Sequence, residues 1–244
     1  MRIVPASDLL DAWERAAAQP PAQRPLTLLA AASEGATAET LAGHSVGRRD
    51  ADLLSLREQI FGPRLVSVAG CPSCGERLEL TFDASEIRAA APPETAETLS
   101  VAAGGYAVEF RLPDSLDVMS IAGSSDVAAA RLELIERCLL RAAREGADVP
   151  PSEVPDEIID AVAARMGEAD PQADVQLDLE CPSCAHRWLA IFDIVSFLWS
   201  ELNAWAHRTL QDVHVLASAY GWRESDILSL TPWRRHVYLE MVGG

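Results

Sequence analysis

The chain has 244 residues, a formal net charge of −17 and a pI near 4.6, and 49% of its residues are hydrophobic, enough for a sizeable core. All 20 basic residues are arginines. Nucleic-acid binding needs a basic surface, so this acidic chain is expected to have no nucleic-acid partner. A membrane span needs about 18 consecutive apolar residues, and the sequence contains no such run, so no membrane partner is expected either. No signal peptide is expected at the N-terminus, and paired thiols are typical of a cytoplasmic protein.

Residues 1–62 predict an N-terminal helical region. Ser7 is the expected N-cap of the first helix, and Gly62 with Pro63 ends the last one. The predicted helices cover residues 8–18, residues 26–32, a short segment after Thr37, and residues 50–61. Apolar residues recur at helical spacing in the first and last of these helices, which predicts a helical core.

Two CxxC motifs, Cys71 to Cys74 and Cys181 to Cys184, each enclose a Pro-Ser turn. Their flanks repeat as well: when residues 66–87 are laid on 176–197, the matched pairs include Arg77 with Arg187, Phe82 with Phe192, and Asp83 with Asp193. Four thiolates in two such pairs suit a tetrahedral Zn²⁺ site. We therefore predict one zinc ribbon split between residues 63–90 and 172–195, with Cys71, Cys74, Cys181 and Cys184 as ligands.

The spacing of the two motifs leaves alternatives open. Ordinary ribbons separate their cysteine pairs by about 15–20 residues, whereas more than 100 residues intervene here. A disulfide within each CxxC, or a thioredoxin-like redox motif, would also fit the cysteines, although a redox motif is expected to open a helix rather than a strand. Cys138 is expected to be a small buried hydrophobic residue, and His186 to be no ligand.

Residues 91–171 predict an inserted module that follows an Ala/Pro/Glu linker over 89–97. Strands over 98–103 and 106–112 flank Gly104-Gly105, a hairpin turn signal. Two helices are expected after the hairpin: one over 126–144, capped by Ser124 or Ser125, and one over 156–166.

Residues 196–244 predict a helical C-terminal part. A long helix from Asp193, its predicted cap, to Tyr220 carries an apolar face, and Gly221 ends it. The predicted face comprises Val195, Trp199, Leu202, Ala206, Leu210, Val213, Ala217 and Tyr220. Two short helices follow, over 224–230 and from Pro232. Aromatic and arginine side chains are enriched at interface hot spots, so this tail is the candidate protein-binding surface: Trp222, Trp233, Arg234, Arg235 and Tyr238. We expect the tryptophans to point inward and both arginines outward.

The sequence holds no Gly-rich phosphate loop, no GxSxG and no HExxH motif. A catalytic zinc keeps one coordination position open, whereas four thiolates would fill the shell. The zinc is therefore expected to be structural and the protein to be no enzyme.

Several segments resemble the T-even-phage baseplate hub assembly chaperone family, encoded beside contractile tails and extracellular contractile injection systems. They are both CPSC motifs and residues 61–65, 111–115, 217–230, 232–235 and 238–240. The resemblance implies partners among the hub, spike or wedge proteins of a baseplate. It transfers no individual binding residue, and the family does not generally require zinc.

Together these observations predict a mostly helical α+β protein with a split four-cysteine zinc ribbon and an inserted hairpin and helices. The predicted function is a non-enzymatic assembly factor, similar to a hub assembly chaperone, of a contractile baseplate. The alternatives are a permanent structural subunit of the baseplate and a zinc-ribbon regulator of transcription.

Overall fold

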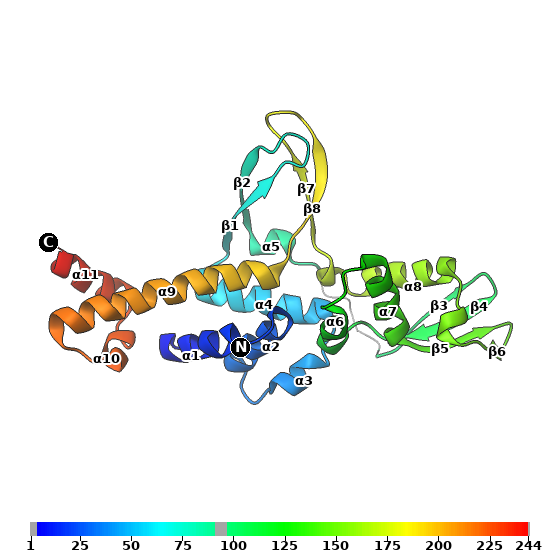
Figure 1. The fold of residues 1–244 in the computed structure, drawn as a ribbon, viewed down its shortest axis with the longest axis horizontal. Helices are drawn as coiled ribbons and strands as arrows, with labels where there is room; N and C mark the ends of the chain where they lie inside the picture. Colours follow the sequence, from blue (N-terminus) through cyan, green and yellow to red (C-terminus); the bar gives the residue numbers. More distant parts are fainter. Residues whose placement is uncertain (1–3, 91–96, 244) are drawn as a thin grey trace.

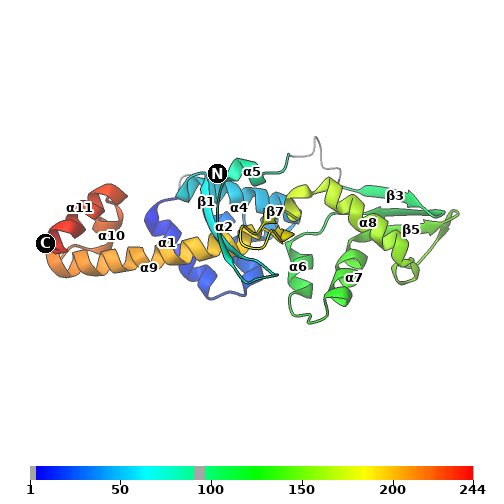
Figure 2. The ribbon, with the colours of Figure 1, turned by 90° about the horizontal axis from the view of Figure 1, so that it is seen from above.

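The structure, a computed structural model, describes residues 4–90 and 97–243. The molecule is elongated, with a pair of β-hairpins projecting from its middle, the inserted module at one end and the C-terminal helices at the other (Figures 1 and 2). The helices are α1 (Ala6–Ala17), α2 (Arg24–Ala32), α3 (Ala38–Ala42), α4 (Val46–Phe61), α5 (Ala84–Ile87), α6 (Ser115–Ile121), α7 (Val127–Cys138), α8 (Asp156–Ala169), α9 (Ile194–Tyr220), α10 (Glu224–Leu228) and α11 (Pro232–Gly243). The strands are β1 (Arg64–Gly70), β2 (Arg77–Asp83), β3 (Leu99–Ala103), β4 (Tyr106–Phe110), β5 (Leu139–Arg144), β6 (Ala147–Asp148), β7 (Gln176–Glu180) and β8 (Arg187–Ile191).

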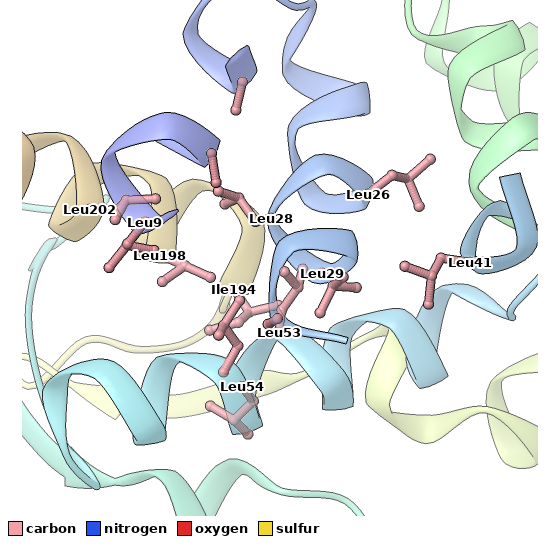
Figure 3. Packing of buried hydrophobic residues seen from close by; sticks show 14 of the residues in the cluster. Leu9, Leu26, Leu28, Leu29, Leu41, Leu53, Leu54, Ile194, Leu198 and Leu202 are labelled. Carbon is pink, nitrogen blue, oxygen red and sulfur yellow. The ribbon is translucent and has the colours of Figure 1, made fainter. Parts of the chain in front are cut away.

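The main core lies between α1, α2, α4 and the first turns of α9 (Figure 3). Leu29, Leu53, Leu54, Leu198 and Leu202 are almost fully buried there. Burying one leucine contributes about 1.5–3 kcal/mol, so this cluster is a major source of stability. It joins the N-terminal helices to a helix that begins well over a hundred residues later in the chain.

The predicted N-terminal helices are confirmed, with two corrections at their starts. The first begins at Ala6 behind Pro5, and Ser7 is not its cap, because the Ser7 hydroxyl donates to the carboxylate of Asp8 instead. The fourth helix begins at Val46 rather than residue 50, because the Ser45 side chain accepts from the backbone N–H of Arg48. Thr37 caps α3 through a capping box with Thr40, as its position predicts.

The two CxxC motifs lie at the tips of two antiparallel hairpins, β1–β2 and β7–β8, which we call the hairpin pair. Both hairpins stand side by side and project away from the helical core (Figure 1). Phe82 and Phe192, matched in the sequence repeat, meet edge to face at its base with ring centroids 5.7 Å apart. Such a contact is worth about 0.5–1.5 kcal/mol beyond burial, so the repeated residues help to hold the two hairpins together.

The inserted module is more strand-rich than the sequence predicts. Its sheet has the order β3-β4-β5-β6 in the described residues, and the hairpin at Gly104-Gly105 forms as expected. The predicted helix over 126–144 forms only as far as Cys138, as α7, and its cap is Asp126 rather than Ser124 or Ser125. Residues 139–144 form β5 instead, which pairs with β4. The module has its own core against α7 and α8. Of the predicted linker, residues 91–96 lie outside the described part of the chain.

The long helix α9 forms as predicted, with the Asp193 side chain accepting from the N–H groups of Val195 and Ser196, and Gly221 in the left-handed conformation at its end. Its buried face differs from the expected one. The buried residues are Ile194, Leu198, Leu202, Ala206, Thr209 and Leu216, so most of the face is displaced by one residue. Leu210 and Tyr220, predicted on the apolar face, are exposed.

The inserted module is joined to the helical core at the start of α4. The backbone N–H of Gly47 donates to the Asp170 carboxylate at 2.8 Å, and that of Val46 donates to the Pro113 carbonyl at 2.9 Å. A Cβ on Gly47 would lie 2.9 Å from the backbone nitrogen of Ala173 and closer still to Asp170. Only glycine therefore fits between α4 and the chain that leaves the module.

Gly47→Ala is expected to lower the free energy of unfolding by about 2 kcal/mol, because the added methyl group forces α4 away from Asp170 and lengthens a buried hydrogen bond. Urea unfolding of the purified variant measures the loss. Gly43→Ala is the matched control: its Cβ would have Thr40 as its nearest neighbour at 3.9 Å, so a change within about 0.5 kcal/mol is expected. Equal unfolding energies for the two variants would contradict the close approach at Gly47.

Candidate metal centre

The structure brings the four predicted ligand residues together at the tips of the hairpin pair. Their sulfur atoms all lie within 4.8 Å of one another, and we call this group the cysteine cluster. The Sγ atoms of Cys71 and Cys184 are 3.7 Å apart, and those of Cys74 and Cys181 are 3.6 Å apart. A tetrahedral unit of zinc and four sulfurs with bonds of about 2.3 Å places its sulfurs about 3.8 Å apart. The cluster could therefore hold a metal ion such as zinc with little rearrangement.

All four cysteines are free thiols, so the alternative of a disulfide within each CxxC does not describe this structure. In each motif the first cysteine is buried and the second is exposed. Cys71 and Cys181 pack with Leu78, Leu80 and Trp188, a small apolar group between the hairpins. Both motifs precede a strand rather than a helix, which also argues against a thioredoxin-like arrangement.

The two CxxC turns have the same backbone geometry. The N–H of Cys71 donates to the carbonyl of Glu76 at 2.8 Å, and that of Gly75 donates back to the Cys71 carbonyl at 2.9 Å. The second turn repeats both bonds, from Cys181 to His186 and from Ala185 to Cys181. Gly75 and Ala185 both have positive φ, 76° and 57°. The repeat in the sequence is thus a repeat of a folded turn.

The thiols influence one another's ionisation. Burial raises the pKa of Cys71, but hydrogen bonds from the backbone N–H groups of Cys74 and Ser73 outweigh it and lower the pKa to about 7. The backbone N–H of Glu76 lowers the pKa of Cys74, whereas the neighbouring sulfur of Cys184 and burial raise it to about 12. Four thiolates this close cannot all be charged unless a cation neutralises them, and metal ligands must be deprotonated. The cluster is therefore suited to a cation.

Substitutions at the matched positions Gly75 and Ala185 are expected to change the free energy of unfolding in opposite directions. Gly75→Ala is expected to destabilise the protein by about 1 kcal/mol, because a Cβ disfavours the left-handed conformation. Beyond residue 75 and its two chain neighbours, no heavy atom of the described residues lies within 4 Å of that Cβ, so the effect is conformational rather than steric. Ala185→Gly should stabilise by a few tenths of a kcal/mol, because the relief of strain exceeds the entropy that glycine adds to the unfolded chain. Thermal unfolding of both variants measures the effects, and equal signs would contradict the shared turn geometry.

His186 and Cys138 both lie outside the cysteine cluster. His186 stacks on Trp188, with centroids 6.0 Å apart, and is not among the clustered ligands. Cys138 is fully buried, and burial, with Asp117 adding to it, raises the pKa of its thiol to about 12, so it is unreactive. The sequence also predicts an apolar helical stripe of Cys138 with Val127, Leu134 and Ala142. That prediction is wrong, because Val127 is 83% exposed and Ala142 lies on β5.

The tail residues form an aromatic group rather than one exposed patch. Trp222 stacks on Tyr220 at 4.7 Å and meets Tyr238 edge to face at 4.8 Å. Trp233 is 76% exposed and Arg235 is buried beside Asp212, both opposite to the expected orientation, whereas Arg234 is exposed as expected. Trp233 and Arg234 thus stay accessible for a protein contact, and Arg235 holds α11 against α9.

Sequence reasoning missed four exposed apolar side chains on the outer surfaces of the hairpin pair. They are Val66 and Val68 on β1, and Leu189 and Ile191 on β8. The alternation of side chains along each strand could have indicated them, because every second residue of a strand faces away from the small core between the hairpins.

These features define a mostly helical α+β protein in which a cysteine cluster joins two distant segments and could hold a metal ion. The family model of the T4 bacteriophage base plate protein matches residues 28–199, which include both CxxC motifs and the whole inserted module. The chain belongs to this family. No curated protein and no solved structure gives a match to it. In the described residues no helix is long and apolar enough to cross a membrane.

Proposed function

We propose that the protein is a non-enzymatic assembly factor of a contractile phage tail or injection-system baseplate, stabilised by structural zinc. The observation that carries the baseplate role is the family match over residues 28–199. Other baseplate proteins are accordingly its expected partners, and hub, spike or wedge subunits are the candidates.

Zinc is the proposed ion because the cluster consists of four sulfurs at tetrahedral spacing. Four thiolates leave no position for a substrate or a reactive water, which supports a structural role and a protein without enzymatic activity. The ion would hold the tips of two hairpins that are already held at their base by Phe82 and Phe192. The result is a rigid projection from the helical core.

Protein contact is supported by apolar surface at two places. The hairpin pair exposes Val66, Val68, Leu189 and Ile191 by 49–77%, and the tail exposes Trp233. Exposed apolar groups of this kind mark interaction sites when they gather on one element. The net charge of −17 argues against a nucleic-acid partner.

A permanent structural subunit is the second candidate, and the description of the matched family as a base plate protein favours it. Deleting the gene and imaging the particles by electron microscopy tests the baseplate role, and normal particles in the deletion strain would overturn it. Quantitative mass spectrometry of purified mature particles separates the two candidates. A stoichiometric amount of the chain indicates a permanent subunit, and its absence from complete particles indicates an assembly factor.

A further inference from the structure

The hairpin pair carries a groove of about 460 Å³ between β2 and β7. Each hairpin has only two strands in the described residues, so β2 and β7 each have one edge without a neighbouring strand. Free strand edges present unpaired N–H and C=O groups and can pair with an added strand.

The groove follows these edges. Its lining includes four consecutive residues of β2, 79–82, and four of β7, 176–179. Successive side chains of a strand point to opposite faces, so consecutive residues can all line one groove only where it runs along the backbone edge. The free edges of β2 and β7 therefore lie along one common groove.

The lining is apolar at its floor and acidic at its rim. Leu80, Phe82 and Leu177 are partly buried there, whereas the carboxylates of Glu79, Glu86 and Asp178 are on exposed residues. None of the described residues that line the groove is an arginine. The Asp178 carboxylate is paired with Arg187 at 2.7 Å, and the Glu86 carboxylate accepts a hydrogen bond from the backbone N–H of Asp83 at 3.3 Å. Glu79 forms no ion pair among the described residues. This surface complements apolar and cationic side chains.

We propose that the groove binds an extended segment of a partner protein in which apolar residues alternate with arginine or lysine. The segment adds a strand to the edges of β2 and β7, and its apolar side chains contact Leu80 and Leu177. Its cations face Glu79 and Glu86. The inference deepens the proposed function and rests on it only for the expectation that the partner is another baseplate protein.

The test uses the full chain and two short fluorescein-labelled peptides, one alternating valine with arginine and the other valine with glutamate. Fluorescence anisotropy at physiological ionic strength should show binding of the arginine peptide alone. Glu79→Arg should weaken that binding about five- to tenfold, because an attractive rim charge becomes a repulsive one. Glu109→Arg is the matched control, since it makes the same charge change on an exposed strand residue of the inserted module, and it should bind as the wild type does.

Hydrogen exchange gives the second measurement. Bound arginine peptide should slow amide exchange within residues 79–82 and 176–179, as expected for an added strand. The proposal is overturned if the arginine peptide does not bind, if both glutamate variants weaken binding equally, or if protection appears elsewhere. A second copy of the chain in the groove, seen as a dimer that Glu79→Arg disrupts, would also overturn it. These results concern the groove alone, whereas particle imaging of the deletion strain tests the baseplate role.

Discussion

Cys71→Ser is expected to abolish tight zinc binding and to release the tips of the hairpin pair from one another. Cys71 is the buried first cysteine of its motif, and although burial raises the pKa of its thiol, hydrogen bonds from the backbone N–H groups of Cys74 and Ser73 lower it to about 7. Structural zinc sites of four ligands contribute about 10–16 kcal/mol of apparent binding free energy. Losing one thiolate should therefore remove most of the tip's stability.

The expected damage is local. The main core contains Leu53, Leu198 and Leu202 but none of the four cysteines, so the helices should persist while the hairpins loosen. Metal analysis of the purified proteins should find zinc in the wild type and none in the variant. Hydrogen exchange should accelerate within β1, β2, β7 and β8, and far-UV circular dichroism should retain most of the helical signal.

Ser73→Ala is the matched control for this prediction. Ser73 lies in the same turn and is exposed, and its contribution to Cys71 comes from its backbone N–H, which alanine keeps. It should bind zinc as the wild type does. A full zinc content in Cys71→Ser, or unchanged exchange in the hairpins, would contradict the proposed metal site. A loss of zinc in both variants would point instead to a general sensitivity of the turn.

The cysteine cluster could be predicted from the sequence because its information is local and duplicated. Each CxxC encodes a turn that places two sulfurs on one side, and the matched Phe82 and Phe192 indicate that both copies have the same surroundings. The contact between these two rings confirms that the repeat is also a contact in space. The long separation of the two motifs along the chain did not indicate whether they meet in space, because the inserted module between them folds around its own core.

Elements that depend on distant partners were predicted less well. Residues 139–144 continue the Leu, Ala and Arg composition of α7, which favours a helix, yet they form β5 because the edge of β4 is available for pairing. Arg235 was expected outside because arginine usually is, but Asp212 on α9 provides a partner at 3.2 Å. The Gly47–Asp170 contact is likewise invisible in local sequence, since two residues from separate regions create it.

An ion pair between a buried arginine and a partly exposed glutamate, beside the main core, supports the second large prediction. The guanidinium of Arg57, on α4, donates to both carboxylate oxygens of Glu201, on α9, at 2.8 Å each. It also donates to the carbonyl of Gly62 at 2.6 Å and lies over the ring of Phe197. Arg57 is only 2% exposed, so its charge depends on Glu201 for compensation.

Glu201→Ala is expected to lower the free energy of unfolding by about 3 kcal/mol, because it leaves a buried guanidinium without its counterion. The paired change Arg57→Leu with Glu201→Leu should recover much of that loss, since apolar replacements remove the uncompensated charge as well as the pair. Urea unfolding at neutral pH measures both variants. Asp160→Ala is the control: it removes the acid of the exposed Arg131–Asp160 pair, whose oxygen and nitrogen are 2.7 Å apart, and should cost less than about 1 kcal/mol. If Glu201→Ala were as mild as Asp160→Ala, Arg57 would have to reach water without its partner. The ion pair would then contribute little to holding α9 against α4.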